Sequence, residues 1–381
     1  MFFKLLFGNP LTFVAIVHAY VGWQLVPAFA FSPLAQVAFT GYLVLSFALI
    51  PLAMRVRSMR DPSRGDQIAW AGFLAMGLFS SLFVLTLLRN IGLAVTSLAF
   101  QHPGASLRHY SAAAVPALAL FASVAGLLSA RRGARVEEVD IPIAGLDPAW
   151  EGFSIVQISD IHVGATIKRG FVTAIVDKVN ELQPDMVAVT GDVVDGSVAQ
   201  LSTHTQPLAE LKSRHGTYFV TGNHEYYSGA TAWIDEFRRL GMTVLNNEHR
   251  VLRRGAASLI IAGVTDEGSA SFEPSHKSDP IQALAGAPAD ARVKILLAHR
   301  PGSAAAAQTA GFTLQLSGHT HGGQFWPWNL FVGFFNPFAV GLHRLRDLWV
   351  YVNRGTGYWG PPKRFGVPAE ITRLRLVTAA P

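Results

Sequence analysis

The sequence predicts an all-α region of about four membrane-spanning helices at residues 1–135, followed by an α/β domain at residues 136–381. Half of the 381 residues are hydrophobic and only 15% are charged, whereas an ordinary soluble domain has about 25% charged residues. The first third of the chain contains long uncharged apolar stretches. From about Val136, short β-branched runs alternate with helix-like segments and turns, which is typical of an α/β domain.

Four apolar stretches in the N-terminal region predict membrane spans. None contains Asp, Glu, Lys or Arg, and each approaches the roughly 20 residues that a helix needs to cross a bilayer. The first is the weakest because it contains His18, Gln24 and Pro27, and Ala28–Ala30 resembles a signal-peptidase site. Three spans remain if it is cleaved. The predicted spans are Leu11–Phe29, Leu34–Met54, Ile68–Leu88 and Ala112–Ala130.

The net charge of +6 is unevenly distributed. Residues 1–135 have a balance of +8, and the rest of the chain has a balance of −2. Four arginines at positions 55–64 and three at 131–135 flank the spans on one side with Lys4, against Arg89 and Arg108 on the other. The positive-inside tendency therefore predicts a protein of the cell (inner) membrane whose α/β domain is cytoplasmic. A nucleic-acid partner is not expected, because the α/β domain has no excess of basic residues.

The α/β domain is predicted from short apolar runs and the segments between them. Three segments read as helices: Lys168–Leu182, Thr231–Leu240 and Pro280–Ala285, and Ala304–Ala307 also favours a helix. Seven runs read as strands, many of them apolar enough to be buried on both faces. They are Ser154–Ser159, Met186–Thr190, Tyr218–Thr221, Ser258–Val264, Lys294–Ala298, Thr313–Ser317 and Leu348–Val352.

Residues able to bind metal follow five of these strands, where an open α/β sheet presents its ligands. If the chain is extended at Asp160–His162 and His319–His321, alternate side chains point the same way and can reach one ion. The sequence carries no Cys, so thiolate ligands are excluded. The motifs are Asp160-Ile161-His162, Gly191-Asp192, Gly222-Asn223-His224-Glu225, His299 and Gly318-His319-Thr320-His321-Gly322-Gly323.

This ligand set predicts two divalent metal ions. Carboxylates, neutral imidazoles and an amide oxygen suit Mn²⁺, Fe²⁺ or Zn²⁺. Six or seven ligands exceed what one ion can use while it keeps a position open for water. A single Asp-x-His is common in loops, and the glycines could be no more than turn residues, but five motifs together favour a metal centre. Asp195 could support the ligand residues from behind, but a turn or cap role is expected for it.

The five motifs together resemble the calcineurin-like metallophosphoesterase superfamily, whose pattern of D-x-H, G-D, G-N-H-[DE], H and G-H-x-H is complete and in order over residues 150–370. The segment Asn353–Gly357 and the membrane-linked N-terminus are similar to the YkuE- and YaeI-type branch. The resemblance implies a β-sandwich flanked by helices. It also implies that one metal is held by Asp160, His162 and His321, the other by Asn223, His299 and His319, with Asp192 bridging them.

The resemblance further implies the chemistry. His224 would be the catalytic acid that protonates the leaving oxygen or steadies the phosphate, and Asn223, His224 and Arg354 would contact the substrate. Two metal ions can activate a water and clamp the phosphoryl oxygens, so no protein nucleophile is required. The expected function is hydrolysis of a phosphate ester or pyrophosphate bond, in the manner of a phosphodiesterase or a UDP-diacylglucosamine pyrophosphatase.

Rival functions remain open. A protein phosphatase or nuclease could use the same metals, although a nuclease would need a basic groove. The chain could also be a membrane binding or transport protein with a regulatory metal domain, but no charged residue lies inside the predicted spans. The uncharged, aromatic-rich stretch Gln324–Leu342 suggests a lipid or lipid-linked phosphate as substrate, with membrane lipid as partner. Alternatively, these aromatics pack inward as core.

Overall fold

The computed structural model describes residues 9–29, 32–59, 61–100 and 104–379. Lys4, Ala30 and Arg60, which entered the topology prediction, lie outside the described residues. The chain divides into two compact units. The helical unit comprises residues 1–128 and Gly360–Phe365, and the α/β unit comprises Ser129–Trp359 and Gly366–Pro381.

The helical unit contains four helices in the described part of the chain that are long and apolar enough to cross a membrane. They are α2 (Pro10–Leu25, continued by the 3-10 turn Val26–Phe29), α3 (Pro33–Ala53), α4 (Pro62–Phe100) and α5 (Ala105–Arg131). Asn9 and Ser32 cap the first two, because each side chain accepts a hydrogen bond from a first-turn N–H group. Each predicted span therefore has its helix.

Helix α4 is much longer than the predicted span Ile68–Leu88. Its 39 residues correspond to roughly 58 Å at about 1.5 Å per residue, whereas a bilayer core is about 30 Å thick. The helix packs closely against α3 at Gly72, where an added Cβ atom would lie only 2.5 Å from Ala53 Cβ. The uncharged run thus marks the middle of the helix but not its ends.

The segment Gly360–Phe365 belongs to the helical unit although it lies far from the helices in sequence. The ammonium group of Lys363 donates hydrogen bonds to Gly77 O at 2.9 Å, Ser81 Oγ at 2.6 Å and Ser123 Oγ at 3.1 Å. A Cβ atom at Gly126 would lie 2.6 Å from Lys363 Cγ. The segment therefore packs against α4 and α5 where glycine leaves room for it.

The described residues of the α/β unit form two six-stranded mixed sheets. The first has the order β1-β12-β2-β3-β4-β5 and the second β10-β11-β9-β8-β7-β6. Strands β2, β3, β4 and β5 are parallel to their neighbours in that series, as are β7, β8, β9 and β11 in theirs. The bounds are β1 (Arg135–Ile143), β2 (Ser154–Ile158), β3 (Met186–Val189), β4 (Thr217–Phe219), β5 (Thr243–Val244), β6 (Glu248–Arg254), β7 (Ala257–Gly263), β8 (Val293–Leu297), β9 (Leu314–Ser317), β10 (Gly341–Leu345), β11 (Leu348–Val352) and β12 (Glu370–Thr378).

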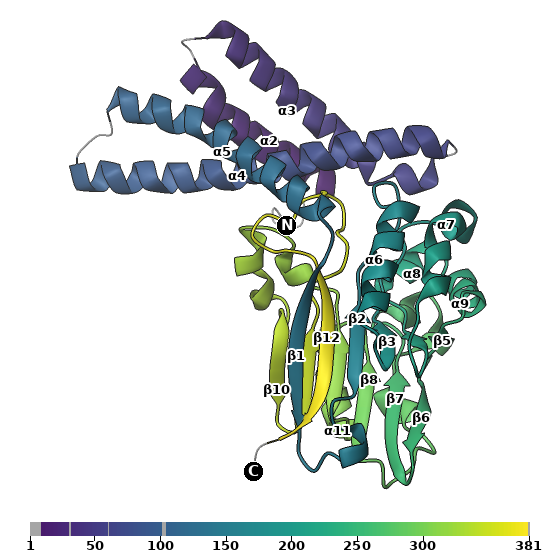
Figure 1. Ribbon diagram of the computed structural model, residues 1–381. Helices are drawn as coiled ribbons and strands as arrows, with labels where there is room; N and C mark the ends of the chain where they lie inside the picture. Colours follow the sequence, from purple (N-terminus) through teal and green to yellow (C-terminus); the bar gives the residue numbers. More distant parts are fainter. Residues whose placement is uncertain (1–8, 30–31, 60, 101–103, 380–381) are drawn as a thin grey trace. The chain divides into compact units, whose positions relative to one another are not determined.

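The two sheets pack face to face and carry helices on their outer faces (Figure 1). Successive side chains of a strand point to opposite faces, so Ile155 of β2 lies in the core between the sheets and Val156 lies under the helices. The helices are α6 (Arg169–Glu181), α7 (Val198–Thr205), α8 (Asn223–Ser228), α9 (Ala230–Arg239), α10 (Pro280–Ala283) and α11 (Ala304–Ala310). This is the predicted β-sandwich flanked by helices.

Candidate metal centre

The predicted ligand residues all lie just beyond the carboxyl ends of strands, as expected. Neighbouring parallel strands end at the same edge of a sheet, so their terminal loops come together. A parallel bridge between Val163 and Val194 joins two of these loops. The residues follow β2 (Asp160 and His162), β3 (Asp192), β4 (Asn223 and His224), β8 (His299) and β9 (His319 and His321).

The chain is not extended at these residues, so that part of the sequence prediction is wrong. Asp160, His162, Asp192, His319 and His321 have φ angles between 51° and 70°. The left-handed region costs a non-glycine residue about 1–2 kcal/mol, and such residues concentrate at functional sites. Hydrogen bonds hold the loops in place, because the N–H groups of Asp160 and His162 donate to the carbonyl groups of Gly191 and Asp192, at 3.0 and 3.1 Å.

Two glycines in the motifs are required for close approach rather than for a positive φ. A Cβ atom at Gly222 would lie 2.2 Å from Asp192 Oδ1. A Cβ atom at Gly318 would lie 2.2 Å from Asp160 Oδ2. Each glycine therefore leaves space for the carboxylate of another motif, which explains its position directly before a ligand residue.

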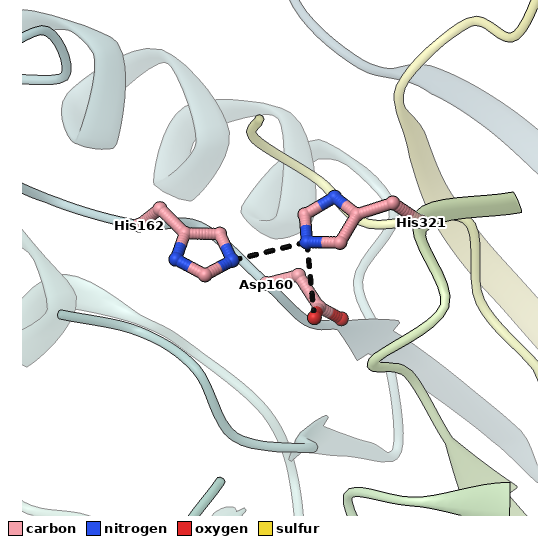
Figure 2. A group of neighbouring side chains, drawn as sticks. All are labelled: Asp160, His162 and His321. Carbon is pink, nitrogen blue, oxygen red and sulfur yellow. Dashed lines mark hydrogen bonds and ion pairs between the residues drawn. The ribbon is translucent and has the colours of Figure 1, made fainter. Parts of the chain in front are cut away.

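The first group of converging side chains consists of Asp160, His162 and His321 (Figure 2). Nε2 of His162 lies 3.0 Å from Nε2 of His321, and Nε2 of His321 lies 3.4 Å from Asp160 Oδ1. The Asp160 carboxylate also accepts the N–H group of His319. Each of the three residues offers one ligand atom, and these atoms lie within 4.8 Å of one another, close enough to bind one metal ion.

The second group consists of Asp192, His299 and His319. Nε2 of His299 lies 3.1 Å from Asp192 Oδ2 and 3.2 Å from Nδ1 of His319. The other ring nitrogen of His299 lies 2.8 Å from the carbonyl oxygen of Thr190, which fixes the ring orientation. Asn223 Oδ1 is buried and has no hydrogen-bond partner among the described residues.

Asp195 joins His162 and His224, contrary to the turn or cap role predicted for it. Its carboxylate oxygens lie 3.3 Å from His162 Nδ1 and 2.5 Å from His224 Nδ1. With Nδ1 facing Asp195, the Nε2 atom of His224 lies 3.8 Å from Asp192 Oδ2. Asp195 therefore orients both the predicted acid and a predicted ligand. Its spacing of three residues from Asp192 is the only sequence signal that could have indicated this.

Glu225 is buried beneath the site and contacts the backbone rather than the ligand side chains. Its oxygens accept N–H groups of Gly222, Asp192 and Val193 at 2.7, 2.9 and 2.8 Å. Burial and the nearby Asp192 raise the pKa of Glu225 to about 7. Both oxygens nevertheless accept N–H bonds, so the ionised form is the one that these donors fit. Glu225 thus ties the loop after β3 to the loop after β4.

Charges at the site are set by burial and by the close carboxylates. Burial, followed by the neighbouring Asp192, raises the pKa of Asp160 although two histidines oppose the shift. Burial alone would raise the pKa of Asp192, but His299 outweighs it and the pKa lies well below the usual range. Burial and then His299 lower the pKa of His319 to about 3. The neutral imidazole that a metal ligand requires is therefore the stable form of His319.

These observations fit a pair of divalent metals. Three carboxylate–histidine groups, the two above and His162 with Asp195 and His224, each bring their ligand atoms within 4.8 Å of one another. The donor atoms are the N and O types that Mn²⁺, Fe²⁺ and Zn²⁺ accept, and Asn223 Oδ1 is a buried acceptor in need of a partner. A lone pair on each of two imidazole nitrogens 3.0 Å apart is also better satisfied by a shared cation than by one proton.

The side chain of Arg354, which was predicted to contact the substrate, pairs with carboxylates. Its guanidinium group forms ion pairs with Glu370 and with Glu137, so two carboxylates already neutralise it. Lys363 and Arg364, a few residues further along the chain, are buried and belong to the segment that packs in the helical unit.

Comparison with known proteins agrees with this geometry. A family model described as calcineurin-like phosphoesterase matches residues 153–323, which include all seven predicted ligands. A transmembrane protein with metallophosphoesterase domain from Bos taurus is 41% identical over 281 residues, covering 70% of this chain and 63% of that protein. The chain thus spans less than two thirds of the length of this relative.

Two bacterial relatives are covered more fully. An uncharacterized metallophosphoesterase of Aquifex aeolicus is 32% identical over 243 residues, covering 62% of this chain and 89% of that protein. The uncharacterized metallophosphoesterase YkuE of Bacillus subtilis is 29% identical over 246 residues, covering 60% and 80%. The α/β unit, which carries the match, is therefore a phosphoesterase unit, and the chain belongs to the calcineurin-like phosphoesterase family.

Proposed function

We propose that the protein is a membrane-anchored, dinuclear-metal phosphoesterase that hydrolyses a phosphate ester or pyrophosphate bond with water as the nucleophile. The observation that carries the proposal is the convergence of two carboxylate–histidine groups at one edge of the sandwich. Asp160, His162 and His321 would hold one metal, Asn223, His299 and His319 would hold the other, and Asp192 would serve both. Such a pair supplies charge that activates water and stabilises phosphoryl oxygens.

The residues around the metals have separate tasks. His224 protonates the leaving oxygen through Nε2, which lies on the Asp192 side of its ring. Asp195 holds the Nδ1 side and so keeps the proton-bearing nitrogen directed at the substrate. Glu225 fixes the backbone beneath both. Removing a general acid typically lowers turnover by about 10²–10⁴.

The substrate is a lipid or lipid-linked phosphate. Support comes from the uncharged stretch Gln324–Leu342, where Phe334 and Phe335 are 80% and 84% exposed. Some aromatic side chains of the stretch pack inward instead, because Phe325 is buried and Phe338 packs against the core beside β11. Exposed apolar side chains in a chain with four apolar helices are suited to the headgroup boundary of a bilayer. The exposed members are Trp328, Leu330, Phe331, Phe334, Phe335 and Val340.

The helices lie in the cell membrane, and the phosphoesterase unit lies on its cytoplasmic side. The basis is the excess of basic residues at positions 55–64 and 131–135 over those at 89 and 108. A cytoplasmic unit would take its substrate from the inner leaflet.

Hydrolysis assays on the purified full-length chain test the function. The protein is stripped with chelator, reloaded with Mn²⁺, Fe²⁺ or Zn²⁺ in turn, and given phosphate monoesters, diesters and pyrophosphates, including lipid phosphates and nucleotide-linked lipids in mixed micelles. Metal-dependent turnover that falls in His224→Ala supports the proposal. Metal binding without turnover of any substrate would favour the alternative, a binding or transport protein with a regulatory metal domain.

The lipid substrate is tested separately. Phe334→Ser combined with Phe335→Ser should slow cleavage of a lipid phosphate and leave a small soluble ester unaffected. Ile281→Ser is the matched control, because Ile281 is also an exposed apolar side chain of the same unit but lies on α10. Equal losses on both substrates, or equal effects of the control, would contradict the lipid assignment.

A further inference from the structure

The ring of His224 is flanked by two aromatic side chains from distant parts of the chain. The ring centroid of Tyr227, three residues further along α8, lies 5.3 Å from that of His224. The ring centroid of Trp359 lies 5.7 Å from it. Both rings meet the imidazole edge-on, at interplanar angles of 63° and 74°. The surroundings of the predicted acid are therefore aromatic on two sides.

Trp359 is held in this position by its backbone. Its N–H group donates to Oε1 of the buried Gln324 at 2.8 Å, and the Nε2 atom of Gln324 donates to the carbonyl oxygen of Trp359 at 2.9 Å. Gln324 follows the first metal group by three residues, because it lies just beyond His321. The paired hydrogen bonds fix Trp359 relative to the site without using its indole ring.

Tyr227 continues into an exposed aromatic surface. The ring centroid of Phe272 lies 5.6 Å from that of Tyr227 and 5.9 Å from that of Tyr226. Tyr227 and Phe272 are 52% and 56% exposed, whereas Tyr226 is buried. A buried ring thus supports two rings that remain open to a ligand. Aromatic surface exposed beside a catalytic centre is a feature of binding sites rather than of ordinary surface.

We propose that Tyr227, Phe272 and Trp359 form a subsite for the organic part of the substrate and favour esters whose leaving group carries a ring, namely a sugar or a nucleobase. The inference rests on the proposed phosphoesterase function. A phosphate placed beside Asp192 and the Nε2 side of His224 has its ester substituent next to these rings. A nucleobase can form offset or edge-to-face contacts with these aromatic rings, and a sugar, which has no π-system, can pack its C–H face against them. None of the three side chains is charged.

Binding measurements on the full-length, Mn²⁺-loaded protein test the subsite without catalysis. Inorganic phosphate, methylphosphonate and phenylphosphonate are titrated by calorimetry. Phenylphosphonate should bind about three- to tenfold more tightly than methylphosphonate, the gain that one aromatic contact gives. In Tyr227→Ala and in Trp359→Ala this preference should fall toward one, while the affinity for inorganic phosphate stays within about twofold. Tyr227→Phe, which keeps the ring, should keep the preference.

The outcomes separate the two proposals. If inorganic phosphate does not bind, the phosphoesterase function itself is wrong. If phosphate binds but the wild-type protein takes both phosphonates equally, the subsite is wrong and the function stands. The affinities for glucose 1-phosphate and for a nucleoside 5′-monophosphate then identify the ring. In glucose 1-phosphate the sugar is attached directly to the phosphate, whereas in the nucleotide the ribose separates the base from the phosphate. If neither binds better than glycerol phosphate, the ring preference is overturned.

Discussion

Replacing Glu225 by Gln should destabilise the phosphoesterase unit strongly although the shape of the side chain is kept. One carboxylate oxygen accepts from Val193 and Val194 and the other from Gly222 and Asp192. The amide has only one acceptor oxygen, so its NH₂ group must face two backbone N–H donors in either orientation. Losing charge-assisted bonds of this kind costs about 1.5–3 kcal/mol each, and two of them give about 3–6 kcal/mol.

That loss is a large fraction of the stability of a typical domain, about 5–15 kcal/mol. For a unit of this size about 1 kcal/mol shifts Tm by about 2–4 °C, so we expect Tm to fall by about 10–20 °C. The assay is thermal unfolding of the full-length protein in detergent, followed by tryptophan fluorescence at pH 8, above the pKa of about 7 of Glu225. Metal content should fall too, because Glu225 anchors the loops carrying Asp192 and Asn223.

The matched control is Glu236→Gln. Glu236 is also largely buried, but on α9 its carboxylate is paired with Arg239, and such an exposed partner contributes at most about 1 kcal/mol. A Tm of Glu225→Gln no lower than that of Glu236→Gln would refute the reasoning, since the buried N–H groups would then have found other acceptors.

Three further predictions concern the metal centre. Asp192→Ala should lower the metal content from about two ions per chain toward none by elemental analysis, because it removes the shared carboxylate; unchanged content would exclude a bridging role. His224→Ala should keep the metals while turnover falls by about 10²–10⁴, and equal loss of both would make His224 a ligand. Burial lowers the pKa of His299, but Asp192 outweighs it and raises the pKa to about 10. Metal binding near pH 7 should therefore release about one proton from His299, so affinity should rise with pH. Calorimetry in buffers of different ionisation enthalpy measures this release, and a buffer-independent heat would contradict it.

The sequence predicted those elements that have a strong local pattern. Strand β11 was predicted at its observed bounds, and α6 and α9 within about one residue, because buried runs and helical periodicity are strong local signals. Strands β1 and β12 were missed. They pair with each other in parallel over nine residues and carry charges such as Glu138 and Arg375, and β1 is buried at only two of its nine residues. Such strands are specified by their partner more than by their own pattern.

The candidate site likewise has features that the sequence could predict and features that it could not. Residue types and spacing were sufficient to predict seven ligand residues, and six of them lie in the two groups of converging side chains described above. They could not predict the left-handed backbone of Asp160 and His162, which depends on hydrogen bonds to a loop some 30 residues away. They also could not predict the role of Asp195, because a short carboxylate in a loop has the same sequence appearance whether it caps a turn or orients two histidines.

The position of Gly360–Phe365 bears on how this protein can be dissected and how its relatives can vary. The chain leaves the phosphoesterase unit after Trp359 and rejoins it at Gly366, and in between it depends on Ser81, Ser123 and Gly126 for its contacts. A truncated enzyme that begins after α5 would carry a buried lysine segment with nothing to receive it, directly next to the tryptophan that flanks His224. Helices α4 and α5 therefore supply the contacts that Lys363 needs, and a truncation that removes them exposes this lysine segment.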